Sequence, residues 1–135
     1  MRRRGTALVA AAAALALGAS ACGGGEDFAN EPRPPVPAEV SVQVADNGVT
    51  VSPREVGAGL VNFTIANLGE VATTVAIDGP ASGESEEIGP GGTGRLRLDM
   101  ATGDYEVEAP NADGEPFAFT VGPERESGSN QLLLP

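Results

Sequence analysis

The feature that most constrains the fold is an alternation of apolar and polar residues, with a period of two, between residues 39 and 122. Val40, Val42 and Val44, for example, are separated by single polar residues. Because successive side chains of a β-strand point to opposite faces, this pattern predicts strands with one buried and one solvated face. It predicts strands within residues 40–44, 49–51, 61–65, 73–77, 96–100, 105–107 and 117–121.

Turn-forming residues separate these strands. Glycine, proline, asparagine and aspartate fall between the alternating runs and hardly ever inside one. Asn47-Gly48 is the clearest signal, because Asn-Gly favours the two-residue turn of a β-hairpin. Seven such strands predict one all-β domain over residues 39–122, an antiparallel seven-stranded Greek-key sandwich, with an immunoglobulin-like sandwich as an alternative.

The composition excludes several classes of function. The chain of 135 residues contains no histidine, no lysine and a single cysteine. It therefore offers no imidazole base, no His metal ligand, no intramolecular disulfide and no thiolate metal cage. The formal net charge of −11 argues against nucleic acid, and it suits either the solubility of an exported domain or a cationic partner. We therefore predict a protein that is not an enzyme and that binds no cofactor.

The first 22 residues carry the features of an export signal. Arg2, Arg3 and Arg4 form a positive start, residues 7–17 form an eleven-residue apolar stretch, and small residues lead to Cys22. As a helix, that stretch would span about 16 Å, roughly half of the hydrocarbon core of a bilayer. A permanent transmembrane helix is therefore the weaker interpretation.

The segment Ala19-Ser20-Ala21-Cys22 resembles the end of a bacterial lipoprotein signal, although Ala19 stands where that family usually carries leucine. The resemblance implies removal of residues 1–21 and lipidation of Cys22. An ordinary signal peptide, cut after Ala21, would instead leave a free thiol. We expect a lipid-anchored protein on the extracytoplasmic face of the cell membrane. The anchor must provide the attachment, because anionic headgroups repel an acidic domain.

The segments on either side of the domain are predicted to have no core of their own. Residues 22–38 are rich in glycine and proline and predict a tether that spaces the domain from the membrane. Residues 123–135 predict a flexible tail. This tail ends in Leu132-Leu133-Leu134-Pro135, and the three leucines could also bind a partner or lie against the sandwich.

Three segments, in order along the chain, resemble the cupredoxin family. They are residues 51–69, which end in Asn67-Leu68-Gly69, then residues 88–94, and then residues 103–107 around Tyr105. The resemblance implies a cupredoxin-like sandwich. In immunoglobulin-like sandwiches a tyrosine at this place locks a corner through its hydroxyl, and we expect Tyr105 to have that structural role.

A working cupredoxin binds copper through two histidines, one cysteine and usually a methionine. The resemblance places the first histidine near Thr73, the cysteine at Ala109 and the remaining ligands in residues 110–116. None of these positions holds a histidine, cysteine or methionine. We therefore predict a cupredoxin-like domain that lacks the type 1 copper site, and we assign no metal ligands.

Acidic residues offer a second kind of metal site, one for a hard cation such as Ca²⁺. Five of them are expected near one end of the sandwich, where they would form a weak Ca²⁺ site or belong to a solvated strand face: Asp104, Glu106, Glu108, Asp113 and Glu115. Residues 78–92, which carry several further acids, are predicted to form a mobile loop.

These features together favour a non-catalytic binding or scaffold module. The sequence names neither its protein partner nor its oligomeric state. The alternative is an envelope protein that binds a small ligand or Ca²⁺. An enzyme with paired carboxylates, of the glycosidase type, is disfavoured because so small a domain offers little cleft and contains no tryptophan.

Overall fold

The structure is a computed structural model that describes residues 34–126. The predicted signal segment 1–21, Cys22, residues 23–33 of the predicted tether and residues 127–135 of the predicted tail lie outside the described residues. Between residues 34 and 126, no helix is long and apolar enough to cross a membrane.

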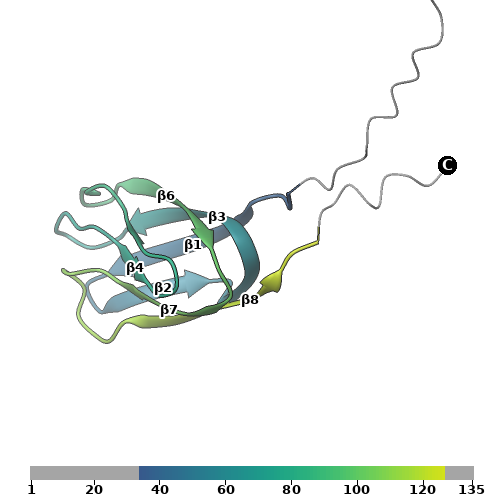
Figure 1. Cartoon of the computed structure of the whole chain (residues 1–135). Coiled ribbons are helices and arrows are strands. Elements are labelled where there is room, and N and C mark those ends of the chain that lie inside the picture. Colours follow the sequence, from purple (N-terminus) through teal and green to yellow (C-terminus); the bar gives the residue numbers. More distant parts are fainter. Residues whose placement is uncertain (1–33, 127–135) are drawn as a thin grey trace, which may run out of the picture. The chain divides into compact units, whose positions relative to one another are not determined.

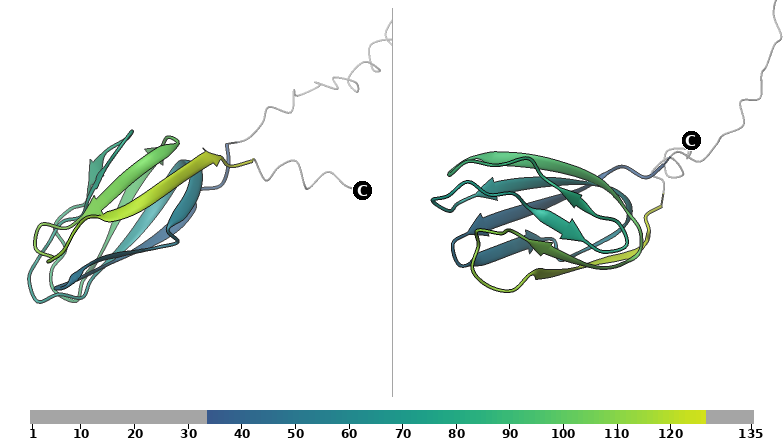
Figure 2. Two further views of the ribbon diagram at one scale, coloured as in Figure 1. Left: turned by 90° about the horizontal axis from the view of Figure 1, so that it is seen from below. Right: turned by 60° about the vertical axis from the view of Figure 1, so that its left-hand side comes forward.

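Eight strands form the domain, and they lie in two facing layers (Figure 1, Figure 2). They are β1 (Ala38–Ala45), β2 (Gly48–Ser52), β3 (Glu55–Asn67), β4 (Ala76–Asp78), β5 (Gly83–Glu84), β6 (Thr93–Met100), β7 (Gly103–Glu108) and β8 (Phe117–Glu124). Strand β8 therefore continues two residues into the segment that the sequence predicts to be tail.

Strand β3 belongs to both layers. From Gly59 onward it pairs with β6, and from Val61 onward it also pairs with β1. Strand β2 pairs with β1, so β2, β1, β3 and β6 form one layer. Residues 55–58 pair with β8, and β7, β4 and β5 complete the other layer. The crossing lies at Gly57 and Gly59, and Gly59 has a φ of +117°, which a residue with a side chain rarely adopts.

The pairing corrects two details of the predicted sandwich. The domain is all-β, as predicted, but β3 runs parallel to both β1 and β8, so the sandwich is not wholly antiparallel. Side chains alternate in the same way in parallel and antiparallel strands, so alternation does not indicate the direction of the neighbour. The strand that the sequence did not predict is β5, which at two residues is too short to show an alternation.

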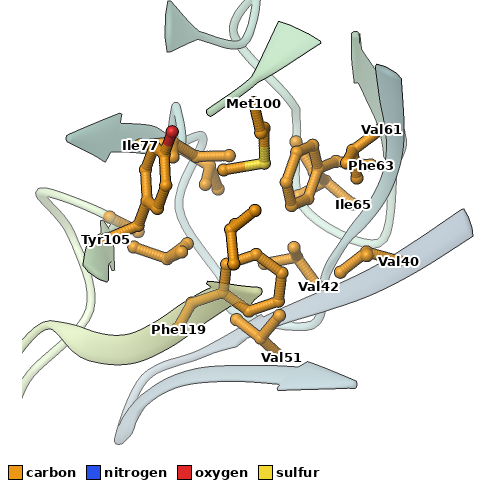
Figure 3. Close-up of a cluster of buried hydrophobic side chains, with 14 of the residues drawn as sticks. Val40, Val42, Val51, Val61, Phe63, Ile65, Ile77, Met100, Tyr105 and Phe119 are labelled. Atoms are coloured by element: carbon orange, nitrogen blue, oxygen red, sulfur yellow. The ribbon is translucent and has the colours of Figure 1, made fainter. Parts of the chain in front are cut away.

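The core lies between the two layers and consists of the faces that the alternation predicts to be buried (Figure 3). On β1, for example, Val40, Val42 and Val44 are buried while their neighbours face solvent. Phe63 of β3 and Phe119 of β8 meet across the layers, with ring centroids 6.1 Å apart in an edge-to-face arrangement. The aromatic pair thus joins the two sheets at the centre of the core.

Arg125 joins the beginning of the described chain to its end. Its guanidinium donates hydrogen bonds to the carbonyl oxygens of Val36 (2.6 Å), Gly57 (3.2 Å) and Leu60 (2.7 Å). These contacts bring the segment before β1, the crossing of β3 and the segment after β8 to one end of the domain, which we call the base. The polypeptide therefore enters and leaves the domain at the base (Figure 1).

Tyr105 locks a corner next to β7, as expected from the sequence. Its side chain is buried, and its hydroxyl donates a hydrogen bond to the carbonyl oxygen of Ala101, 2.9 Å away. A Cβ at Gly79 would come within 2.5 Å of the tyrosine ring, so the ring packs directly on the β4–β5 loop. Tyr105 thus connects the β6–β7 turn to a neighbouring loop.

We predict that Tyr105→Phe lowers the free energy of unfolding by about 1 kcal/mol, because one hydrogen bond is lost while the ring stays in place. For a domain of this size, that change corresponds to a fall of about 4–8 °C in the melting temperature, measured by circular dichroism. An unchanged melting temperature would show that the hydroxyl contributes nothing to the corner.

Candidate functional site

Four loops gather at the end of the domain opposite the base, which we call the distal end (Figure 1). They are residues 46–47 after β1, residues 68–75 after β3, residues 85–92 after β5 and residues 109–116 after β7. This is the end at which the cupredoxin resemblance places the metal ligands, so its geometry decides what the domain can bind.

Asn67 organises the distal end. This last residue of β3 is 1% exposed, and its side-chain amide donates to the carbonyl oxygens of Val71 (2.8 Å) and Ile88 (2.9 Å). Its side-chain oxygen accepts a hydrogen bond from the backbone N–H of Gly69, 3.0 Å away. One buried side chain thus fixes the turn that follows β3 and joins it to the loop of residues 85–92.

The loop of residues 85–92 is held further by its own buried residues. The backbones of Thr73 and Ile88 exchange two hydrogen bonds of 2.8 and 3.0 Å, and Ile88 is buried. The hydroxyl of Ser85, also buried, accepts a hydrogen bond from the backbone N–H of Val75 at 3.0 Å. The prediction of a mobile acidic loop over residues 78–92 is therefore wrong: the segment contains β5 and is anchored by buried residues, while its charged side chains face solvent.

The loop of residues 109–116 is bonded to two neighbouring loops. Asn111 donates from its side-chain amide to the carbonyl oxygen of Ala72 at 2.6 Å. The backbone N–H of Asp113 donates to the carbonyl oxygen of Asp46 at 2.9 Å. The bond from Asn111 therefore connects the two loops in which the cupredoxin resemblance places the metal ligands.

The residues at the predicted ligand positions do not fit type 1 copper. Thr73 is buried, and its hydroxyl donates to the carbonyl oxygen of Thr74 at 3.1 Å. Ala109 presents a buried methyl group. Met100, the methionine of the described residues, is buried and pairs with Gly59 near the base. A type 1 site needs two imidazoles and a thiolate, and residues 34–126 contain neither kind of donor.

The five acids do not lie near one end, so that expectation is wrong. Strand β7 carries Asp104 beside the base, where it faces Thr120, and carries Glu108 at the distal end. In the described part of the chain, no group of three or more acids, cysteines or histidines is placed to hold a metal ion. The alternation of charges along β7 reflects its solvated face.

Two exposed apolar side chains stand on the loop that Asn67 fixes. Leu68 and Val71 are each 62% exposed, and the exposed Glu70 lies between them in the sequence. Sequence reasoning did not single them out. A signal was present, because both fall outside the alternation of any strand: Leu68 is the middle residue of the Asn67-Leu68-Gly69 turn, and Val71 follows it by two residues.

The hollow beside these loops is small. Its volume is about 230 Å³, and its lining includes Glu108, Ala109, Asp113 and Glu115. Pockets for small molecules usually measure about 300–1,000 Å³ and are mostly apolar, whereas this lining is mainly polar. The distal end therefore presents a fixed surface with two apolar side chains instead of a ligand pocket.

Comparison with known proteins supports the fold. No family model and no curated protein matches the chain. A solved structure described as a multicopper oxidase matches it with a TM-score of 0.51 and 16% sequence identity, over 67% of this chain. The fold is cupredoxin-like. The match covers 46% of the oxidase chain, and at this identity it shows the fold alone.

We predict that Asn67→Ala lowers the free energy of unfolding by about 3 kcal/mol, because it removes three hydrogen bonds, including those to the carbonyl oxygen of Val71 and the N–H of Gly69, and leaves a space where a buried side chain was. The matched control is Asn62→Ala, whose side chain bonds only to the exposed Glu39 and whose loss should cost less than about 0.5 kcal/mol. Urea unfolding measures both values. Equal midpoints for the two variants would contradict the role of Asn67.

Proposed function

We propose that this chain is a lipoprotein anchored at the extracytoplasmic face of a bacterial membrane, and that its metal-free cupredoxin-like domain binds a protein partner without catalysis. The observation that carries the binding role is the loop of Leu68 and Val71. Its two apolar side chains are exposed, yet the loop is held in place by the buried side chain of Asn67. A loop ordered before binding loses little further conformational entropy when a partner docks.

The position of this loop also suits a binding role. The polypeptide enters and leaves the domain at the base, whereas Leu68 and Val71 lie at the distal end. A lipid on Cys22 would attach upstream of the base, so the distal end would be the one available to a partner in the envelope. The lipoprotein signal and the glycine- and proline-rich tether support this arrangement from the sequence.

The charge of the distal loops supports a cationic partner. These loops contain no arginine and carry six acids: Asp46, Glu70, Glu86, Glu87, Asp113 and Glu115. The arginines of the described residues lie elsewhere, on or near β3, β6 and β8. An apolar contact surrounded by negative charge suits a protein surface with an apolar recess and a basic border, because such a surface is electrostatically complementary.

The alternative function is binding of Ca²⁺ or a small ligand. In its favour, Glu108, Asp113 and Glu115 all line the hollow of about 230 Å³ at the distal end. Against it, the described residues contain no group of three acids placed to share one ion. Without such a group, at most two carboxylates would share an ion, and two carboxylates supply fewer oxygens than the six to eight that Ca²⁺ usually takes.

Cys22→Ala tests the anchor. We expect this variant to lose metabolic labelling with a fatty acid and to leave the membrane fraction, because the thiol is the attachment point. Ser20→Ala, which keeps a small residue in the signal, should retain both properties. The lipoprotein interpretation fails if the unaltered chain carries no acyl group or if Cys22→Ala remains membrane-bound.

A photo-cross-linking residue at position 71 tests the binding surface. In intact envelopes, we expect one discrete adduct whose yield falls several-fold with Leu68→Ser and also at high ionic strength, which screens the acids. The matched control places the same residue at position 64, where Thr64 is exposed on the outer face of β3. Identical adducts from both positions, or an adduct that Leu68→Ser leaves unchanged, would contradict binding through the distal loop.

A further inference from the structure

An apolar groove opens at the base of the domain. Its volume is about 500 Å³, and it is lined by residues 34–37, Gly59 and Leu60, together with Arg97, Asp99 and Glu124. Most of the exposed lining is apolar. Val36 is the most exposed large apolar residue of the described chain, at 74%. The apolar lining and the exposed side chain of Val36 make this groove a candidate docking surface.

The end of the described chain leads directly to this groove. Arg125 follows Glu124, which lines the groove, and its guanidinium donates hydrogen bonds to the backbone of two further lining residues, Val36 (2.6 Å) and Leu60 (2.7 Å). Whatever follows Glu126 in the sequence therefore starts beside the groove.

The sequence that follows carries a matching apolar segment. Leu132, Leu133 and Leu134 come six to eight residues after Glu126, and no other part of the proposed function uses them. Six residues of extended chain span about 20 Å, which is enough to turn back onto the groove. The intervening Ser127-Gly128-Ser129-Asn130 consists of residue types that favour turns.

We propose that the segment Leu132-Leu133-Leu134 of the same chain docks in the base groove. A segment on the same chain meets the groove at a much higher effective concentration than a segment on another molecule. A second copy is further disfavoured because the formal net charge of −11 makes two copies repel each other. Docking would cover the side chains of Val36 and Leu60, which line the groove.

The proposal is independent of binding at the distal end, since groove and distal loops lie at opposite ends of the domain. It adds a contact that holds residues 34–37 to the domain, next to the hydrogen bond that Arg125 makes with Val36. Loss of the contact should leave cross-linking at position 71 unchanged. Docking of the segment at the base and partner binding at the distal end can therefore be contradicted separately.

Methyl NMR of the full chain tests the docking. We expect nuclear Overhauser contacts between methyl groups of Leu132–Leu134 and those of Val36 and Leu60. The combined substitutions Leu132→Ser, Leu133→Ser and Leu134→Ser should abolish these contacts, shift the amide signals of Val36, Gly59 and Leu60, and lower the melting temperature by a few degrees. The control Leu68→Ser, an exposed leucine at the distal end, should leave all three readouts at the base unchanged.

Two results would overturn the proposal. One is the absence of nuclear Overhauser contacts between Leu132–Leu134 and the groove, together with unshifted amide signals in the triple variant. In that case the segment does not occupy the groove, which is then open to solvent or to another protein. The other is a set of contacts that appears between differently labelled molecules in a mixed sample, because the occupant would then be the tail of a second copy.

Discussion

The path of β3 is the constraint on which the rest of the domain depends. This strand pairs with β8 in one layer, crosses at Gly57 and Gly59, and then pairs with β1 and β6 in the other layer. The crossing is possible because glycine tolerates the backbone conformation at position 59 and because glycine at position 57 leaves room for Arg125, whose side chain would clash with a Cβ there. One strand therefore holds the layers together, and its two ends define the base and the distal end.

At the distal end of this cupredoxin-like fold, hydrogen bonds join the loops. The side-chain amides of Asn67 and Asn111 donate to backbone carbonyl groups of neighbouring loops. Buried hydrogen bonds of this kind order the loops in advance. The hydrogen bonds of Asn67 therefore also fix the loop on which Leu68 and Val71 are exposed.

Much of the fold was predictable because its signals are local. Alternation identified the buried faces, and the position of Tyr105 indicated its corner hydrogen bond. The parallel pairing of β3 was not predictable, because strand direction depends on residues distant in the sequence. The burial of Ile88 was missed within an acidic stretch, since one apolar residue forms no pattern. The exposure of Leu68 and Val71 was missed although both lie outside the alternating runs, because whether a loop residue is covered also depends on packing with residues distant in the sequence.

The proposal that the domain binds no metal can be tested directly by calorimetry of the full chain with Ca²⁺ and with Cu²⁺, combined with melting in the presence of each ion and of a chelator. A ligand that binds only the folded state raises the melting temperature by an amount that grows with its concentration relative to Kd, so the two readouts check each other. We predict no saturable heat and the same melting temperature under all conditions, because hydrogen bonds and buried residues hold the distal loops and no group of three acids within residues 34–126 is placed to hold an ion. Saturable heat with a defined stoichiometry, accompanied by a higher melting temperature, would contradict this and favour a metal-binding function.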